Sequence, residues 1–383
     1  MASHDISSAK LSSMCDITYL SDDLLAKIFS LVPFRSTVGC KCVSKRWLDL
    51  ISSPYFIKQF TSYQHSLFKS IFIFVTPHEV VLAFHEQNPS LERPISFGLD
   101  MLIKGSVCGC SNGLFLCCKN RYTYGIDYYI YDPLMKKCVP IPPSPSTCNE
   151  SLFAVGFICN PTGAAVITPS PNERNFRVVI IKSFIKRLFE MELYVFSSET
   201  GSWKRVVMII PDGFAFAPHW LLSFSYGGSL YFMGRTSIFV FDPYTNTRDT
   251  LNYPLEADSM NIMSFGFLGI SCGCLRIADI GQNNLRVWEL VEKNHWDLLH
   301  SIDISKKMSK KFCGNYYKKV AGFHPYDGDI VYLHSYADGV FICNLRTDTF
   351  EVVPGYEKID ISPFQLEIAD LLLPTESSSP SAE

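Results

Sequence analysis

The sequence predicts an α+β protein in which a small N-terminal helical module precedes a large all-β body. Residues 20–51 carry apolar side chains at helical spacing. From about residue 65 onward, short apolar runs alternate with turn residues, and these runs recur along the chain. The 383 residues are 47% hydrophobic and 19% charged, so the chain can bury a sizeable core.

The first helix is expected to begin after Ser21, a residue type that caps helix N-termini. Asp22 and Asp23 place negative charge in the first turn, where the helix dipole favours it. The apolar positions form one wide stripe and are Leu24, Leu25, Ile28, Phe29 and Val32. Pro33 then ends the helix, because proline cannot continue the backbone hydrogen-bond ladder.

A second helical stretch follows, with Ser36 as its expected cap and a break or bend at residues 44–46. Its apolar positions are Val38, Cys42, Val43, Trp47, Leu50 and Ile51. Pro54 closes the module. A unit this small cannot bury all of these side chains internally. The surplus either packs on the rest of the chain or forms a surface for a partner protein.

This module resembles an F-box. The positions that match in order and spacing are Leu20, Asp23, Leu24, Ile28, Phe29, Leu31, Pro33, Val38, Val43, Ser44, Lys45, Trp47 and Leu50. In that family the motif docks on a Skp-type adaptor, which links it to a cullin scaffold and a RING ubiquitin ligase. The residues that the resemblance assigns to adaptor binding are Leu20, Leu24, Ile28, Phe29, Leu31, Pro33, Val38, Val43, Trp47 and Leu50.

Two residues depart from a strong version of this motif. Ser21 stands where the family usually has proline. Serine can cap the helix in its place, so we expect a less preorganised helix start and not a loss of adaptor binding. Gly39 lies inside the second helix and weakens it mildly.

The all-β body repeats one unit several times. Residues 105–140 and 224–254 both contain glycine, an apolar strand, a turn, a strand that ends in an aromatic residue and Asp-Pro, a polar turn, and a strand that ends at proline. Further copies are expected within residues 155–206, 270–302 and 320–354, with a weaker pair of strands at 70–86. A long loop is expected between Pro140 and Leu193.

Repeats of roughly 40–50 residues with three or four strands each are typical of a β-propeller. One blade cannot bury its own faces, so blades stack and close a ring; the repeats favour about six blades, with five to seven allowed. The apolar segment Phe364–Leu373 is expected to close the ring against N-terminal propeller sequence. A β-sandwich is the alternative, although it does not require a recurring Asp-Pro turn.

The body also resembles the F-box-associated repeat region of plant F-box proteins, a kelch-like propeller. The best-matching features are the run Ser111–Leu116 and the Tyr-Asp-Pro that follows it. The predicted division of the chain is a disordered N-terminus at 1–16, an F-box at 17–60, an F-box-associated propeller at 61–370 and a disordered tail at 371–383.

The resemblance implies a substrate-recognition subunit of an SCF-type E3 ubiquitin ligase, with the propeller binding a target protein. The residues predicted to contact the target are His219, Trp220, Tyr316 and Tyr317. Such a receptor does no bond chemistry, so no catalytic residue, metal or cofactor is expected. Two alternatives are a propeller hydrolase with a helical appendage and an F-box scaffold that acts outside ubiquitination.

Charge and hydropathy exclude several other classes of protein. The net charge of −3 and the pI near 6.3 give no reason to expect a nucleic acid or an anionic membrane as partner. The polar N-terminus has no secretory h-region, and no apolar run approaches the roughly 18 residues that span a bilayer. The expected location is therefore the cytosol or the nucleus.

Cysteine and aspartate spacings do not indicate a metal site or an active site. In a reducing compartment the 14 cysteines are expected to be thiols. The clusters Cys108-x-Cys110 with Cys117-Cys118, and Cys272-x-Cys274, lack the spacing of a zinc knuckle. The Asp-Pro pairs at Asp132 and Asp242 could be the two carboxylates of a glycosidase, but their recurrence favours turns.

Overall fold

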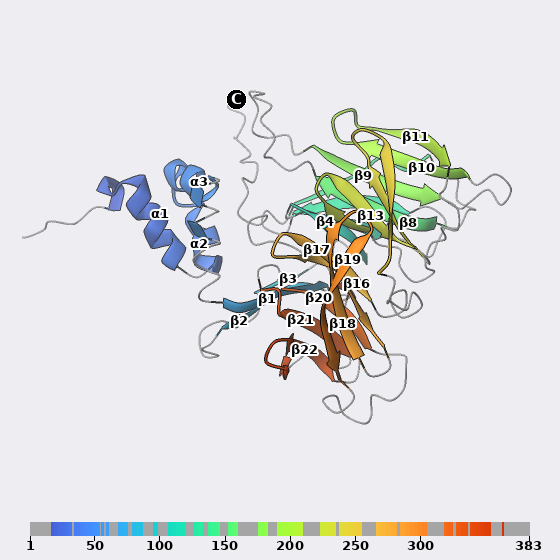
Figure 1. The fold of residues 1–383 in the computed structure, drawn as a ribbon. Coiled ribbons are helices and arrows are strands. Elements are labelled where there is room, and N and C mark those ends of the chain that lie inside the picture. The colour runs from blue at the N-terminus through green and yellow to red at the C-terminus, as the bar shows by residue number, and fades with distance from the viewer. Residues whose placement is uncertain are drawn as a thin grey trace, which may run out of the picture. The chain divides into compact units, whose positions relative to one another are not determined.

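A computed structural model of the chain has two compact units, Met1–Ser66 and Leu67–Glu383 (Figure 1). In the first unit the structure describes residues 17–32, 34–53, 55–56 and 59–60. In the second it describes residues 68–75, 79–86, 95–98, 106–112, 114–119, 126–132, 137–145, 152–159, 175–182, 190–209, 223–234, 237–254, 266–281, 284–304, 318–324, 327–335, 338–353 and 362–363. The predicted disordered ends lie outside these ranges.

The first unit is helical. Its elements are η1 (Ile17–Tyr19), α1 (Asp22–Leu31), α2 (Phe34–Cys40) and α3 (Lys45–Ile51). The Ser21 hydroxyl accepts a hydrogen bond from the Leu24 backbone N–H at 3.4 Å, which confirms the predicted N-cap of α1. Ser44 caps α3 in the same way, with 3.2 Å to the Trp47 N–H.

The predicted cap at Ser36 is wrong, because α2 already begins at Phe34. The link between α1 and α2 is made by the next residue, Thr37. Its buried hydroxyl lies 3.1 Å from two carbonyl oxygens, those of Phe29 and Val32, at the end of α1. The Phe29 carbonyl also accepts from the Val32 backbone N–H at 3.2 Å, so Thr37 adds a side-chain contact to the capped end of α1.

The described residues of the second unit form six four-stranded antiparallel sheets, as many as the repeat units expected from the sequence. Sheet 1 consists of β24 (Ser362–Pro363), β1 (Phe68–Val75), β2 (Glu79–Glu86) and β3 (Ile95–Gly98). Sheet 2 consists of β4 (Ser106–Ser111), β5 (Leu114–Lys119), β6 (Asp127–Asp132) and β7 (Lys137–Pro140). Sheet 3 consists of β8 (Leu152–Cys159), β9 (Phe176–Lys182), β10 (Glu190–Ser197) and β11 (Ser202–Ile209). Sheet 4 consists of β12 (Ser223–Tyr226), β13 (Ser229–Met233), β14 (Ser237–Asp242) and β15 (Thr247–Asn252). Sheet 5 consists of β16 (Phe267–Ser271), β17 (Cys274–Ile280), β18 (Asn284–Glu292) and β19 (His295–Asp303). Sheet 6 consists of β20 (Lys318–Phe323), β21 (Ile330–Ser335), β22 (Gly339–Asn344) and β23 (Thr349–Val353).

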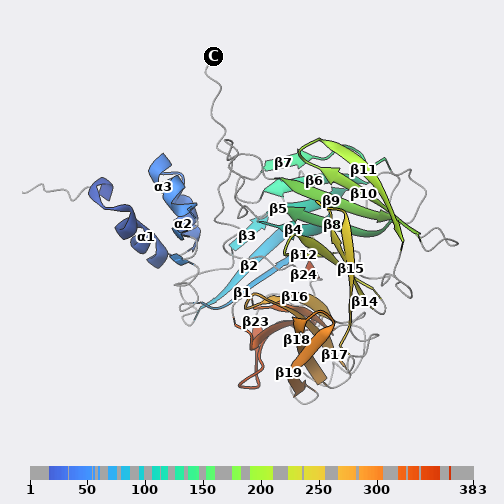
Figure 2. The same ribbon diagram turned by 45° about the horizontal axis from the view of Figure 1, so that its top comes forward.

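The sheets are arranged as a β-propeller. The first strands of neighbouring sheets lie against each other: β4 against β8, β8 against β12, β16 against β20, and β20 against β24. The fourth strands β11, β15, β19 and β23 are largely exposed. Sheets 3 to 6 therefore each have an inner strand toward the centre of the unit and an outer strand toward solvent, as Figure 2 shows for β8 to β11.

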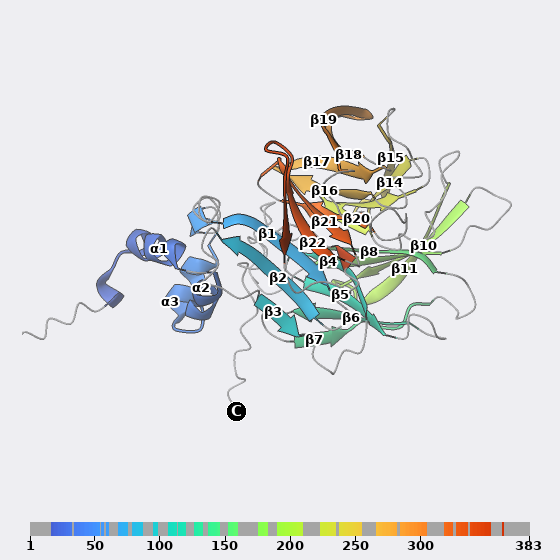
Figure 3. The ribbon, with the colours of Figure 1, turned by 90° about the horizontal axis from the view of Figure 1, so that it is seen from below.

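Sheet 1 joins the two ends of the propeller sequence. Its inner strand β24 pairs antiparallel with β1, with Phe74 opposite Pro363 and Val75 opposite Ser362. Strands β1, β2 and β3 then follow in order (Figure 3). The closing strand lies just before the predicted segment Phe364–Leu373, which is outside the described residues. The described pairing joins C-terminal to N-terminal propeller sequence through Ser362 and Pro363, while the part predicted for Phe364–Leu373 stays a prediction.

Sheet 3 supplies strands to the interval between Pro140 and Leu193, where both a repeat strand and a long loop were predicted. That interval contains β8 and also β9, whose residues Val178–Ile181 are buried. A short continuous apolar run of this kind is what a strand covered on both faces shows. Residues 146–151 and 160–174 lie outside the described residues, so the long loop stays a prediction.

The recurring aspartate is a turn residue. The Asp242 carboxylate accepts hydrogen bonds from the backbone N–H of Tyr244 at 2.8 Å and of Thr245 at 3.2 Å, and from the Thr245 hydroxyl at 2.7 Å. Asn344 does the same at the corresponding turn of sheet 6, where its side chain accepts from two backbone N–H groups at 3.1 and 3.0 Å. The structure thus confirms the turn interpretation for Asp242.

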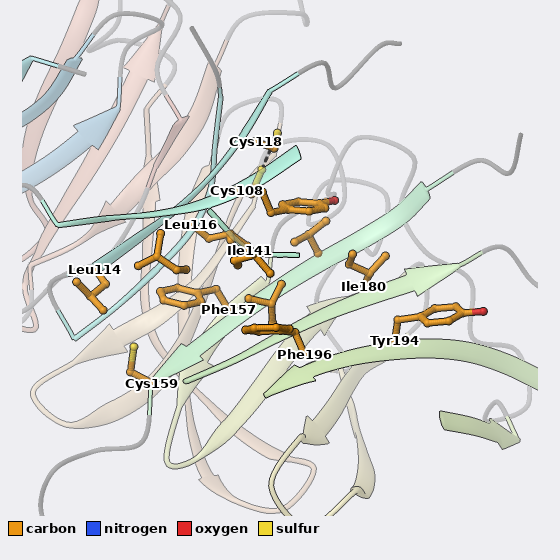
Figure 4. Close-up of a cluster of buried hydrophobic side chains, with 14 residues drawn as sticks. Cys108, Leu114, Leu116, Cys118, Ile141, Phe157, Cys159, Ile180, Tyr194 and Phe196 are labelled. Atoms are coloured by element: carbon orange, nitrogen blue, oxygen red, sulfur yellow. Dashed lines mark hydrogen bonds between the residues drawn. The ribbon is translucent and has the colours of Figure 1, made fainter. Parts of the chain in front are cut away.

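Side chains on the outer strands tie neighbouring sheets together. Trp203 on β11 donates its indole N–H to the Pro142 carbonyl, which follows sheet 2, at 2.8 Å. Trp296 on β19 makes the equivalent bond to the Asn252 carbonyl of sheet 4, also at 2.8 Å. Apolar clusters fill the space between adjacent sheets, as Figure 4 shows for the cluster that includes Leu116, Phe157 and Phe196.

Candidate docking site

The candidate site lies on the helical unit, where apolar side chains face solvent. In α1, Leu24, Ile28 and Leu31 are 52%, 39% and 51% exposed. Their i, i+4, i+7 spacing aligns them along one side of the helix, and we call them the α1 stripe. Val43, in the turn between α2 and α3, is 63% exposed. Exposed apolar side chains gathered in this way are typical of a protein-binding surface.

The other side of α1 forms the core of the unit. Leu25, Ala26 and Phe29 are buried, and the Phe29 ring packs edge-on against Trp47 with ring centroids 4.8 Å apart. Phe29 is 2% exposed and lies against Trp47 in this unit, so little of its ring is open to a partner; its predicted adaptor contact stays a prediction. Its ring fixes how α1 and α3 pack.

The remaining predicted contact residues differ in their exposure. Leu20, Trp47 and Leu50 are half-buried. Val38 lies on α2, and its side chain is not among those described; Pro33 lies outside the described residues. The structure therefore exposes four of the predicted residues (Leu24, Ile28, Leu31 and Val43) and leaves three others (Leu20, Trp47 and Leu50) half-buried.

Three further exposed apolar residues of this unit were not predicted from the sequence: Ile17, Tyr19 and Tyr55. Ile17 and Tyr19 lie on η1, ahead of the helical period, so the period did not include them. The chain that follows them is held by Arg46 of α3, whose guanidinium donates to the Asp22 carboxylate at 2.8 Å and to the Leu20 carbonyl at 2.6 Å.

Several charged residues of the described propeller form ion pairs between strands or between sheets. On sheet 5, Asp279 is fully buried. Its carboxylate accepts hydrogen bonds from the Nε and Nη2 atoms of the Arg286 guanidinium, at 3.0 and 2.6 Å. Asp329 of sheet 6 binds His300 of sheet 5 at 3.2 Å and Arg346 at 2.6 Å. In the ranges that the structure describes, no three or more His, Cys, Asp or Glu side chains gather as a metal site would require.

The predicted target-binding residues cannot be placed in this way. His219 and Trp220 precede β12 in the sequence, and Tyr316 and Tyr317 precede β20; all four lie outside the described residues. Their assignment therefore stays a prediction.

Comparison with known proteins agrees with both units. The family described as F-box protein At3g26010-like, beta-propeller, matches residues 89–366. The chain belongs to this family of F-box proteins. The F-box domain itself matches residues 17–59, which include the α1 stripe and Val43.

Three Arabidopsis thaliana proteins are similar over most of their length. The F-box/kelch-repeat protein At4g22430 is 27% identical over 88% of this chain and 80% of its own. The F-box protein At5g07610 is 26% identical, over 76% of this chain and 72% of its own. The F-box protein At3g26010 is 24% identical, over 86% of this chain and 78% of its own.

The F-box and the propeller are thus shown by sequence comparison as well as by the structure. The helices of the described residues include none long and apolar enough to cross a membrane.

Proposed function

We propose that this F-box protein is the substrate-recognition subunit of an SCF-type E3 ubiquitin ligase. Its F-box docks on a Skp-type adaptor, which carries a cullin-RING scaffold, and its propeller binds a target protein. The observation that carries the proposal is the α1 stripe. Leu24, Ile28 and Leu31 expose apolar surface on a domain type that docks on such adaptors.

The division of α1 into two apolar sides explains how a small unit can do this. Phe29 and Trp47 hold the helix from inside, so the stripe is a preformed surface. Burying a half-exposed Leu or Ile side chain contributes about 1 kcal/mol, so the stripe and Val43 together supply several kcal/mol of apolar burial. Leu20, Trp47 and Leu50, which are half-buried, are proposed to complete the contact.

The decisive experiment measures the affinity of a purified Skp-type adaptor for the full chain and for Ile28→Asp. An aspartate buried without a partner in an apolar interface costs about 2–4 kcal/mol, so we expect a loss of affinity of at least 30-fold. The matched control is Val207→Asp, which makes the same change at a comparably exposed valine of the propeller strand β11. Unchanged affinity of Ile28→Asp would refute docking through the stripe.

Trp47→Asp is the less informative variant, because its ring supports the core. We expect it to lose adaptor binding together with the thermal stability of the helical unit. Ile28→Asp is expected to keep the far-ultraviolet circular dichroism of the parent protein, because the Ile28 side chain already faces solvent.

A receptor of this kind contributes proximity, since it raises the effective concentration of target lysines near the ubiquitin-transferring enzyme. Affinity purification of the full chain under proteasome inhibition would provide targets. Combined substitution of Trp220 and Tyr317 by alanine is expected to reduce their recovery while adaptor binding persists.

The two alternative functions predict different outcomes. A scaffold that acts outside ubiquitination would bind the adaptor, yet its targets would be ubiquitinated equally with and without Ile28→Asp. A propeller hydrolase predicts a central cluster of carboxylates or histidines, whereas Asp242, the candidate carboxylate of a glycosidase, accepts three hydrogen bonds from its own turn. This engagement favours the receptor over the hydrolase.

A further inference from the structure

Two buried thiols meet inside sheet 2. Cys108 of β4 and Cys118 of β5 are each 2% exposed, and their sulfur atoms lie 3.1 Å apart. Figure 4 shows this contact at one end of the apolar cluster. The separation is only about 1 Å longer than a disulfide bond of about 2.05 Å. Small side-chain rotations are therefore enough to bring the sulfurs to bonding distance.

A β-bulge causes this approach. Val107 pairs with Cys117 and Gly109 pairs with Leu116, so Cys108 is an extra residue between two ladder positions. Without the inserted residue, Cys108 would pair with Leu116. The bulge changes the direction of the Cys108 side chain instead. Here it brings the Cys108 sulfur to Cys118, which pairs with Ser106 one step along the ladder.

We propose that Cys108 and Cys118 are a site of reversible disulfide formation, oxidised by hydroperoxides. The peroxide oxidises one thiolate to a sulfenic acid and is reduced to water. The second sulfur attacks the sulfenic sulfur, the S–S bond forms, the S–O bond breaks and a second water leaves. In total one hydrogen peroxide and two thiols give one disulfide and two waters, with two electrons passing from sulfur to peroxide.

Other cysteines of the described residues are less suited to this reaction. Cys117 is adjacent to Cys118, but successive strand residues point to opposite faces of the sheet, so its side chain is directed away from the pair. Cys159 belongs to the same apolar cluster and is as deeply buried, yet Figure 4 shows it at the opposite end from the pair. Cys42 and Cys272 are exposed.

Burial also selects the oxidant. Hydrogen peroxide is small enough to reach the pair during local opening of the sheet, whereas oxidised glutathione is expected to react with exposed thiols such as Cys42 and Cys272. The resulting bond would join β4 to β5 and so constrain the inner hairpin of sheet 2. A cross-link across a short loop should raise the thermal midpoint by roughly 2–5 °C.

The test treats the reduced full chain with graded hydrogen peroxide or with oxidised glutathione, then alkylates all remaining thiols in denaturant. Trypsin releases residues 105–119 as one peptide, which carries Cys108, Cys110, Cys117 and Cys118. With peroxide we expect this peptide to lose about 2 Da and to stay linked after chymotryptic cleavage beyond Phe115. Fragment ions should assign the bond to Cys108 and Cys118. Treatment with dithiothreitol should return the linked peptide to its reduced form.

Cys108→Ala and Cys118→Ala are expected to abolish the linked peptide, while Cys110→Ala and Cys159→Ala keep it. The proposal is overturned if exposed thiols oxidise fully without the linked peptide, or if fragment ions assign the bond to Cys110 or Cys117. These two outcomes are read from the parent protein, so they do not depend on how any variant folds. If only glutathione produces the bond, the assignment of hydroperoxide as the oxidant is wrong.

Discussion

Gly156 on the inner strand β8 provides a direct test of how tightly the propeller is packed. A Cβ added there would lie 2.7 Å from Leu230 Cδ1, 2.9 Å from Phe232 Cζ and 3.0 Å from Ser223 Oγ. Ordinary contacts between carbon atoms are about 3.5–4.0 Å, so the first two overlaps are each close to 1 Å. Both of these partners are buried in the apolar cluster between sheets 3 and 4, where they have little room to move.

Gly156→Ala should therefore destabilise the propeller. Overpacking of this size costs about 2–3 kcal/mol, and the loss of a glycine from the unfolded chain returns about 0.4–1 kcal/mol. We expect a net loss of about 1–2.5 kcal/mol in the free energy of unfolding. The assay is urea unfolding of the full chain, followed by far-ultraviolet circular dichroism in the strand region.

Two controls separate overpacking from a general effect of alanine. Gly39→Ala on α2 adds a Cβ with no atom within 4 Å, so it should leave stability unchanged or raise it. Leu230→Val shortens one of the overlapping side chains, so its effect combined with Gly156→Ala should be smaller than the sum of the two single effects. An unchanged urea midpoint for Gly156→Ala, or strictly additive effects, would show that the inner strands are not packed as described.

Three further predictions concern single side chains of the propeller. Arg276 is buried beside Glu289 at 2.6 Å, so Arg276→Met should cost about 2–3 kcal/mol in urea unfolding, and adding Glu289→Gln should recover part of it. Tyr244→Phe removes the hydroxyl that donates to the Asn175 carbonyl at 3.2 Å and should lower stability by about 1 kcal/mol, a change measurable by thermal unfolding. Burial raises the pKa of the Cys117 thiol to about 12, so above pH 8.5 the unfolded chain loses a proton that the folded chain keeps. The free energy of unfolding should thus fall between pH 8 and pH 10, by up to about 1.4 kcal/mol per pH unit, and less steeply in Cys117→Ala.

Local signals in the sequence predicted the parts of the fold that depend on near neighbours. Ser21 caps α1 because its hydroxyl needs only a backbone N–H three residues later. Asp242 shapes its turn through residues two and three positions away. The same holds for the recurring strand units, whose order along the chain matches sheets 2 to 6.

The sequence did not separate the two apolar sides of α1. Leu24 and Leu25 are adjacent and equally hydrophobic, as are Ile28 and Phe29, so their period allows either residue of each pair to face the core. Packing against α3 decides the matter, since the contact between Phe29 and Trp47 turns the α1 stripe outward. Three-dimensional packing also makes β9 part of sheet 3.

By itself, then, the sequence determined the class of both units, the F-box motif and the turns of the repeat, because each rests on residues a few positions apart. Only the tertiary structure decided which apolar residues are available to an adaptor, where β24 closes sheet 1 and that Cys108 meets Cys118. Each of these depends on contacts between segments that chain folding brings together, or on one inserted residue that shifts a strand's register. Residue spacing along the chain does not contain that information.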